Sequence, residues 1–228
     1  MIEVIPAILP VTINELRTKV ALVKDFTKYV QLDMCDGVFV PTRSWPQNGK
    51  DLMAVEEIYT EETGLPGWES VNYEFDLMVK NASSKFEDLI KLGPSRMVFH
   101  LEAEDNLLAF FEKLDPYYKS NIEFGIAINT TTDPALLRPF LEHVKFIQCM
   151  GIEIIGKQRQ SFDARVLDQI TKIKAMAPEM IVSVDGSVNA DTAHDLVVAG
   201  ATRLVIGSAI FDELDTGSAI HSFQNITA

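Results

Sequence analysis

The chain has 228 residues, of which 47% are hydrophobic and 23% charged, a composition that supports a buried core and argues against disorder. Its net charge of −13 argues against nucleic acid or an anionic membrane as the main partner, because the phosphate groups of both would be repelled. Cys35 and Cys149 are far apart and form no C-x-x-C pair, which excludes a thiolate zinc cluster. We expect both thiols to be reduced and buried in a cytoplasmic protein.

The N-terminal segment MIEVIPAILP has no basic residues ahead of its apolar ones, so we interpret it as a first strand and not as a signal peptide. No apolar run approaches the ~18 residues that a membrane span needs. From this segment onward, short apolar runs rich in β-branched residues alternate with runs of helical periodicity.

Eight strands and seven longer helices are predicted along the chain. In chain order, strands and helices alternate as strand 2–9, helix 13–26, strand 29–33, helix 50–60, strand 71–76, helix 85–92, strand 97–100, helix 106–114, strand 122–128, helix 134–142, strand 144–150, helix 162–176, strand 180–184, helix 190–199 and strand 203–206. Several strands are continuous apolar runs, as expected when both faces of a parallel sheet are buried. This alternation predicts one (β/α)8 TIM barrel over residues 1–228, with a doubly wound sheet as the alternative.

Polar side chains stand where several of these strands end. In a parallel α/β barrel the functional residues lie at the carboxyl ends of the strands. By that rule, five residues lie together at the carboxyl end of the barrel: Asp33, Asp76, His100, Asn129 and Asp185. Three converging acids indicate a metal site or an acid/base site, whereas a single Asp at a strand end more often caps the next helix. For Asp33 and Asp185 the sequence favours a functional site over helix capping, because each follows an apolar run that we expect to be buried and a glycine comes within a few residues after it.

A second signal lies near the C-terminus, where SVDGSVN (183–189) and LVIGSAIF (204–211) each place Gly-Ser between a strand and a helix. Glycine lets the backbone approach an anion, and the amides at a helix start can bind a phosphate. The loops after strands seven and eight are a common phosphate site in this barrel. We therefore expect a phosphorylated ligand.

Five segments together resemble the ribulose-phosphate 3-epimerase family in order and spacing. These segments are QLDMCDGVFVP, FDLMV, VFHLEA, SVDGSVN and AGATRLVIGSAIF. The resemblance runs over essentially the whole chain. It implies a ribulose-phosphate-binding barrel that holds a phosphosugar at its top, and relatives in this family often form homo-oligomers.

The resemblance also implies roles for single residues. The family uses two histidines and two aspartates to bind a divalent metal, and the aspartates also transfer the proton. Asp33 and Asp185 match the two aspartates, whereas Gln31 and Asp76 stand at the histidine positions and Ala7 at that of an opening serine. The resulting set of oxygen ligands suits Mg²⁺ or Mn²⁺ better than Zn²⁺, and a site without metal remains an alternative.

On the phosphate side, the family positions are matched by Gly156, Gly186, Ser187, Gly207 and Ser208. The family's Gly-x-Gly-Gly-Gln loop after strand six appears here as GKQRQ (156–160). Its two cations, Lys157 and Arg159, either bind phosphate through their side chains or are exposed loop charges. Met78 matches a methionine near the reacting carbons. His100 and Asn129 are expected near the substrate.

The leading hypothesis is epimerisation of a ketose phosphate at C3, by proton transfer between Asp33 and Asp185 through a metal-stabilised enediolate. A catalytically inactive phosphosugar-binding relative is the alternative, because both metal histidines are replaced. A decarboxylase or aldolase of the same barrel type would show Asp-x-Lys-x-x-Asp after one strand. This hypothesis is disfavoured, because the segment Asp33-Met34-Cys35-Asp36 has no lysine.

Overall fold

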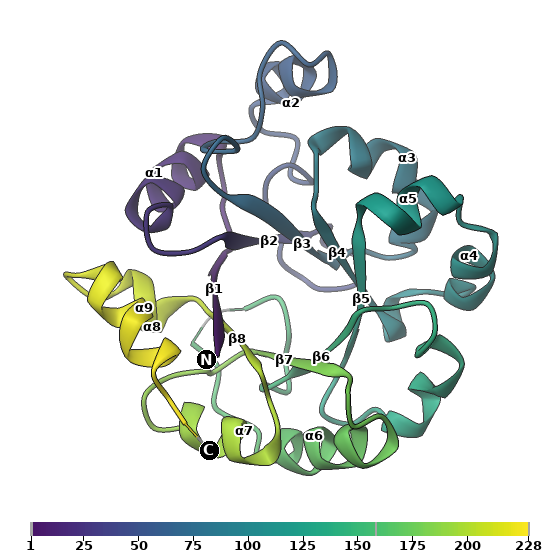
Figure 1. Cartoon of the computed structure of the whole chain (residues 1–228). Helices are drawn as coiled ribbons and strands as arrows, with labels where there is room; N and C mark the ends of the chain where they lie inside the picture. Colours follow the sequence, from purple (N-terminus) through teal and green to yellow (C-terminus); the bar gives the residue numbers. More distant parts are fainter. Residues whose placement is uncertain (1, 158, 228) are drawn as a thin grey trace.

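A closed barrel of eight parallel strands forms the centre of the computed structural model, which describes residues 2–157 and 159–227. The strands follow one another around the barrel in chain order, and helices surround it (Figure 1). The strands are β1 (Glu3–Ile8), β2 (Tyr29–Cys35), β3 (Asn72–Met78), β4 (Arg96–His100), β5 (Glu123–Ile128), β6 (Phe146–Met150), β7 (Ile181–Asp185) and β8 (Arg203–Ile206). The predicted TIM barrel is confirmed, and the doubly wound alternative is wrong.

The helical elements lie between the strands and after β8. The α-helices are α1 (Ile13–Val23), α2 (Leu52–Tyr59), α3 (Phe86–Leu89), α4 (Leu107–Lys113), α5 (Pro116–Asn121), α6 (Arg165–Met176), α7 (Ala193–Ala199), α8 (Ser208–Phe211) and α9 (Thr216–Gln224). The 3-10 helices are η1 (Ala82–Lys85), η2 (Ile90–Leu92), η3 (Leu101–Ala103) and η4 (Pro134–Phe140). No helix in the described ranges is long and apolar enough to cross a membrane.

Several predicted boundaries are wrong. The helix predicted at 134–142 is the 3-10 helix η4, which contains Pro139; proline has no backbone N–H to donate within an α-helix. α5 and α9 were not predicted. The strands β2 and β3 each run two residues beyond their predicted ends, so Asp33 and Asp76 lie inside the strands and not at their last positions.

Alternate residues of each strand face opposite sides of the barrel wall. The outward residues, such as Leu32, Phe75 and Val184, join the large apolar cluster beneath the surrounding helices. Many inward residues are polar and fully buried, among them Gln31 and Glu74, which are register partners on β2 and β3. The barrel therefore has an apolar exterior and a largely polar interior.

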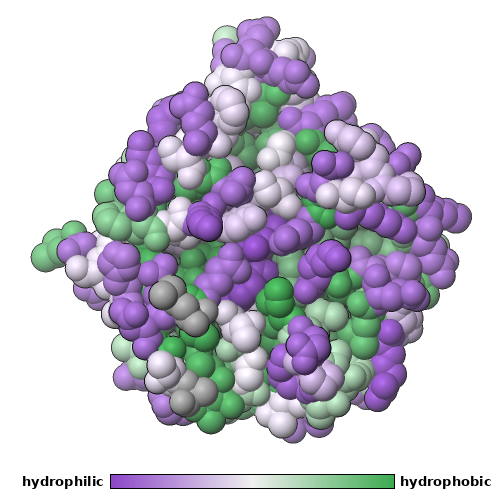
Figure 2. Space-filling view, in the orientation of Figure 1, coloured by the Kyte–Doolittle hydropathy of each residue, from purple (hydrophilic) through white to green (hydrophobic). Residues whose placement is uncertain are grey.

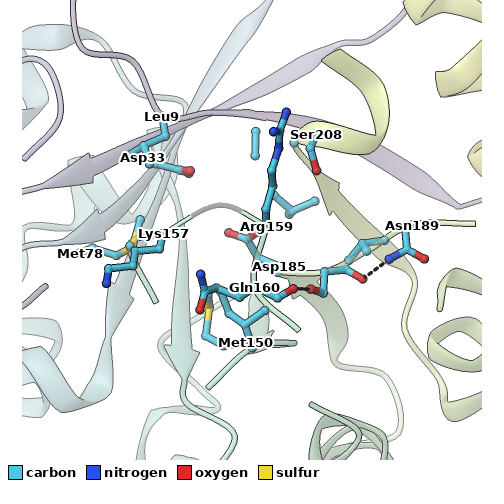
Figure 3. Close-up of a pocket in the computed structure, with 18 residues that line it drawn as sticks. Leu9, Asp33, Met78, Met150, Lys157, Arg159, Gln160, Asp185, Asn189 and Ser208 are labelled. Atoms are coloured by element: carbon cyan, nitrogen blue, oxygen red, sulfur yellow. Dashed lines mark hydrogen bonds between the residues drawn. The ribbon is translucent and has the colours of Figure 1, made fainter. Parts of the chain in front are cut away.

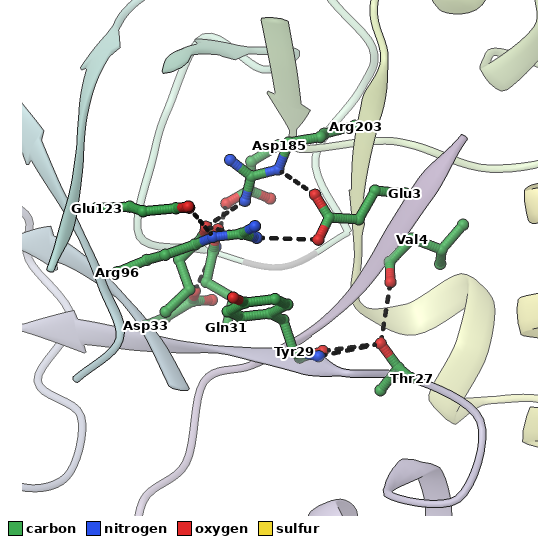
Figure 4. Close-up of polar contacts among 11 residues, drawn as sticks. Glu3, Val4, Thr27, Tyr29, Gln31, Asp33, Arg96, Glu123, Asp185 and Arg203 are labelled. Atoms are coloured by element: carbon green, nitrogen blue, oxygen red, sulfur yellow. Dashed lines mark hydrogen bonds and ion pairs between the residues drawn. The ribbon is translucent and has the colours of Figure 1, made fainter. Parts of the chain in front are cut away.

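The amino ends of the strands are joined by a network of charged side chains, which we call the basal ion network: Glu3, Glu74, Arg96, Glu123 and Arg203 (Figure 4). Arg203 pairs with the fully buried Glu74, and its Nε lies 3.0 Å from Glu3 Oε2. Arg96 donates to Glu3 at 3.0 Å and to Glu123 at 2.7 Å. In Figure 2, hydrophilic residues gather at the centre of the face shown, over the barrel.

The two arginines of the basal ion network also lie over aromatic rings. The guanidinium carbon of Arg96 is 3.6 Å from the ring centroid of Tyr29, and that of Arg203 is 4.1 Å from the ring centroid of Phe146. Cation–π contacts of this kind stabilise a cation that has lost part of its hydration. The network thus closes one end of the barrel with charges that are matched by partners.

Candidate active site

A cavity of about 220 Å³ opens at the carboxyl ends of the strands (Figure 3). Its lining comes from the ends of several strands and the loops that follow them. The predicted site residues in this lining are Asp33, Met78, Gly156, Asp185, Gly186, Ser187, Gly207 and Ser208. Most of the residues predicted from the sequence for one site therefore meet at one cavity.

Three carboxylates lie close together at this site. One oxygen from each of Asp33, Asp76 and Asp185 lies within 4.8 Å of the others. Asp33 and Asp76 are register partners on the adjacent strands β2 and β3, and Asp185 is the last residue of β7. Asp76 is fully buried and does not line the cavity, so it lies behind the two acids that do.

Gln31 connects two of these acids. Its amide Nε2 donates to Asp33 Oδ1 at 2.9 Å and to Asp185 Oδ2 at 2.8 Å. Gln31 stands two residues before Asp33 on β2, so both side chains face the barrel interior. Gln31 is fully buried, and its Oε1 has no hydrogen-bond partner within the described part of the chain.

His100 lies behind the acids, at the end of β4. Its Nε2 is 2.9 Å from Asp76 Oδ1, and both side chains are fully buried. Burial lowers the pKa of His100, but the charge and hydrogen bond of Asp76, together with the charges of Glu102 and Asp185, leave the pKa raised. His100 is absent from the cavity lining, so the structure places it as a partner of Asp76 and not beside the cavity.

The pKa values of the two cavity acids are raised. Burial raises the pKa of Asp185 to about 7, and the nearby Asp76 charge adds to this, whereas the hydrogen bond from Gln31 acts in the opposite direction. Burial, followed by the charges of Asp185 and Asp76, also raises the pKa of Asp33 well above its usual range. In both acids the raised pKa favours the protonated form more than in an exposed aspartate.

The carboxylates fit a hard divalent cation. Asp76 Oδ2 is buried and has no hydrogen-bond partner among the described residues, and the oxygens of all three acids are close together. Mg²⁺ and Mn²⁺ prefer such oxygen ligands. Gln31, which the sequence also predicts as a ligand, directs its amide nitrogen and not its oxygen toward Asp33 and Asp185.

The loop after β7 surrounds the predicted phosphate position. Gly186 has a φ of +102° and Ser187 a φ of +53°, so the chain turns sharply directly after Asp185. The carbonyl oxygen of Ser187 accepts from Asn189 Nδ2 at 3.1 Å and from Thr192 Oγ1 at 2.8 Å, while the Ser187 hydroxyl donates to the carbonyl of Gln160 (Figure 3). These bonds fix the loop at the edge of the cavity.

Two backbone amides at this edge are available to a ligand. Within the described ranges, the N–H groups of Ser187 and Ser208 donate to no backbone or side-chain acceptor. Both residues line the cavity, so the amides can donate to an anion there. The bracing residues Asn189 and Thr192 were not singled out from the sequence, although an asparagine whose side chain accepts from the backbone two residues on, as Asn189 does from Asp191, is a common turn residue.

The two cations of the loop after β6 differ in their surroundings. Arg159 is 73% exposed at its side chain and forms an ion pair with Asp212 at 2.7 Å. Lys157 lines the cavity, beside Met78 in Figure 3, and forms no ion pair with any described residue. Arg159 also lines the cavity, but its charge is already paired. Gln158 lies outside the described residues.

Other expectations have mixed outcomes. Asn129 does not line the cavity; its backbone N–H donates to Glu102 and its carbonyl accepts from Gln169, so it braces the wall beside β5. Asp36 accepts from the N–H groups of Val38, Phe39 and Lys80 and is a structural turn residue. Cys35 and Cys149 are free and buried, as predicted.

Comparison with known proteins supports the sequence resemblance. The model of the ribulose-phosphate 3 epimerase family matches residues 3–211 of the chain. The chain is 27% identical over 228 residues to ribulose-phosphate 3-epimerase of Helicobacter pylori, a match that covers 98% of the chain and 97% of that protein. It is 26% identical over 230 residues to ribulose-phosphate 3-epimerase of Bacillus subtilis, covering 98% and 99% respectively.

Solved structures with the same fold are more distant in sequence. The 3-hexulose-6-phosphate synthase of Salmonella typhimurium gives a TM-score of 0.68 at 14% identity, over 98% of this chain and 97% of that one. KGPDC from Streptococcus mutans gives a TM-score of 0.67 at 13% identity, over 99% and 97%. These likenesses show the barrel fold.

Proposed function

Because the chain belongs to the ribulose-phosphate 3-epimerase family, we propose that it epimerises a ketose phosphate at C3, with ribulose 5-phosphate as the first substrate to test. One observation carries the proposal: Asp33 and Asp185 line the same cavity from β2 and β7 and share the donor Gln31. Epimerisation needs two acid/base groups, one to remove a carbon-bound proton and one to return a proton to the opposite face.

The raised pKa values suit this reaction. The ionised acid of the pair takes the proton from C3, the C–H bond breaks, and its electron pair moves toward the C2 carbonyl oxygen to give an enediolate. The neutral acid then donates its proton to the other face of C3 as the C2 carbonyl re-forms. The two acids have exchanged protonation states at the end, and the substrate has gained and lost one proton.

Asp33, Asp76 and Asp185 would hold a divalent metal in this site, with Mg²⁺ or Mn²⁺ favoured over Zn²⁺. Such a metal supplies a Lewis acid that stabilises negative charge on the enediolate oxygen. Asp76 is well suited to the ligand role, because its Oδ2 is buried without a partner in the described structure while His100 holds its Oδ1.

The phosphate of the substrate is assigned to the edge of the cavity formed by Gly186, Ser187, Gly207 and Ser208. The available amides of Ser187 and Ser208 donate to its oxygens, and Gly156 lies in the same lining. Lys157 lines the cavity without an ion pair to any described residue, and its charge favours an anionic ligand.

A catalytically inactive phosphosugar-binding protein is the second candidate. Gln31 and Asp76, in place of the family's histidines, favour it, because an imidazole pair is absent from the metal site. In that case the cavity binds a phosphosugar and the acids transfer no proton. Both candidates bind a phosphosugar, but only the first converts it to its epimer.

Proton NMR of ribulose 5-phosphate in D₂O tests the proposal directly. The protein should remove the C3 proton signal as solvent deuterium replaces it, and Mg²⁺ or Mn²⁺ should accelerate the exchange more than Zn²⁺. Asp33→Asn and Asp185→Asn serve as matched controls that keep the side-chain shape. Binding of the sugar phosphate without exchange, in the presence or absence of each metal, would establish the inactive candidate instead.

A further inference from the structure

The orientation of Gln31 points to a role different from that of the residue it replaces. We propose that Gln31 is a positioning residue whose amide bridges Asp33 and Asp185, and that it does not ligate a metal. The proposal rests on the proposed function in taking these two acids as the reacting pair. It goes beyond that function, because it states that the uncharged amide of Gln31 holds the two acids in position relative to each other.

The two hydrogen bonds determine which way the Gln31 amide faces. With nitrogen and oxygen exchanged, Oε1 would lie 2.8–2.9 Å from an oxygen of each acid, and it could accept a hydrogen bond only from an acid that is protonated. The –NH₂ group would then occupy the present place of Oε1, which has no partner in the described structure. The observed orientation therefore satisfies two hydrogen bonds, whereas the reversed one satisfies at most one, from the neutral acid of the pair.

The bridge needs a residue with two donor hydrogens on one atom. The acids lie on different strands and are 152 positions apart in the chain, yet one –NH₂ group reaches both. A glutamate of the same length offers no donor, and a methionine of similar volume has no N–H group. Each bond holds one oxygen, Oδ1 of Asp33 and Oδ2 of Asp185, so Gln31 sets the position of the two acids relative to each other.

The site is built for this contact. Gln31 is fully buried and Asp33 is only 9% exposed, so water does not compete freely for the hydrogen bonds. Asp33 and Asp185 still line the cavity, so the bridge leaves both acids accessible to a substrate. A neutral donor lessens the repulsion between the acids while leaving their charge available for proton transfer.

Two variants separate the bridge from a ligand role: Gln31→Met removes the donor, and Gln31→Glu replaces it with an acceptor. In metal-free buffer, the bridge predicts that Tm falls for Gln31→Met and falls further for Gln31→Glu, where a fourth carboxylate meets the acids. The double variant Gln31→Glu/Asp33→Asn should regain part of the loss, because donor and acceptor have changed places. A Tm of Gln31→Glu equal to that of the wild-type protein would overturn the bridge.

Calorimetric titration with Mn²⁺ provides the second readout. If Gln31 bridges the acids, Gln31→Met binds Mn²⁺ as tightly as the wild-type protein or more tightly, since a competing donor is gone. Weakening of Mn²⁺ binding by tenfold or more in Gln31→Met would overturn the proposal in favour of a ligand. Absence of Mn²⁺ binding in both proteins also removes the ligand role and supports the bridge.

Kinetics distinguish positioning from a merely structural role. Gln31→Met should lower kcat by about 10- to 100-fold and change KM by less than about twofold, because the acids are misplaced while the phosphate site is intact. An unchanged kcat in folded Gln31→Met would overturn the proposal. The Tm and Mn²⁺ readouts do not need turnover, so an inactive wild-type protein would defeat the proposed function without deciding the bridge.

Discussion

The two ends of the barrel interior handle buried charge in opposite ways. At the amino ends of the strands, the basal ion network pairs each carboxylate with at least one of two arginines (Figure 4). At the carboxyl ends, Asp33, Asp76 and Asp185 lie together with no arginine or lysine ion pair among the described residues, and Asp76 contacts the imidazole of His100.

This contrast separates structure from function. Where a buried carboxylate has a cation beside it, removal of the cation leaves an uncompensated buried charge and lowers the free energy of unfolding. Carboxylates gathered without a cation raise each other's pKa and lower the stability of the fold, so they are expected where chemistry requires them.

The largest effect is expected on turnover. Asp33→Asn or Asp185→Asn should each lower kcat about 10³-fold or more, because an amide neither accepts nor donates the C3 proton. The measurement is the rate of ribulose 5-phosphate epimerisation by the purified variants. A rate within threefold of the wild-type rate for either variant would break the assignment of the acid/base pair.

The second effect is expected on stability, at the opposite end of the barrel. Arg203→Met should lower the free energy of unfolding by about 3–5 kcal/mol, because it leaves the fully buried Glu74 without its nearest cation. Urea denaturation monitored by circular dichroism measures this loss. Epimerisation per folded molecule should stay near the wild-type rate.

Arg203→Lys is the matched control for that variant, since it keeps the charge while losing the second donor to Glu3. It should lose less stability than Arg203→Met. If the free energy of unfolding fell by less than about 1 kcal/mol in both variants, the buried ion pairs would be no stronger than exposed ones. The two ends of the barrel would then not differ in how they stabilise the fold.

The raised pKa of Asp185 should be visible in how the free energy of unfolding changes with pH. The pKa of Asp185 is raised to about 7 by burial and by Asp76, so the folded state binds a proton more tightly than the unfolded state. The stability that this group contributes is complete below its unfolded pKa and is lost as pH rises toward and through about 7. In metal-free buffer the free energy of unfolding should therefore fall over this range.

Asp185→Asn should flatten that part of the pH profile, because the titrating group is gone. Added Mg²⁺ or Mn²⁺ should flatten it as well, since a cation favours the ionised acids. A wild-type free energy of unfolding that stays level or rises between about pH 5 and pH 7 would contradict the raised pKa, because an acid with a lowered pKa has already reached its full stabilisation above about pH 5.

The smallest effect is expected at the exposed margin of the basal ion network. The side chain of Glu123 is 49% exposed, and it pairs with Arg96 at 2.7 Å. Glu123→Gln should lower the free energy of unfolding by about 0.2–1 kcal/mol, and less in high salt. A loss comparable with that of Arg203→Met would show that burial does not govern the strength of these pairs.

Much of the fold follows from hydrophobic patterns. Eight short apolar runs alternating with helical periodicity predict the barrel, because each strand has one face on the interior and one beneath helices. The pattern fails at 134–142, where apolar spacing suggests an α-helix and Pro139 forces a 3-10 helix. It also misses α5, a six-residue helix with no fully buried residue and thus no apolar stripe to detect.

The site was predicted in part. Asp33 and Asp185 follow apolar runs, and strand order brings them to one cavity. The direction of the Gln31 amide depends on Asp185, which is distant in sequence, so no local pattern indicates it. The basal ion network was missed, although the i, i+2 pair Glu74 and Asp76 on one strand signals two polar residues on the same inward face.

The most direct test of the contrast between the two ends is the free energy of unfolding of Asp33→Asn relative to the wild-type protein, measured by urea denaturation in metal-free buffer. We expect the stability of Asp33→Asn to be equal to or higher than that of the wild-type protein. Removing one of three clustered charges relieves repulsion, and the asparagine oxygen still accepts from Gln31. A loss of about 3 kcal/mol or more, as expected for Arg203→Met, would show that the acids at the carboxyl ends are structural partners and would contradict the account.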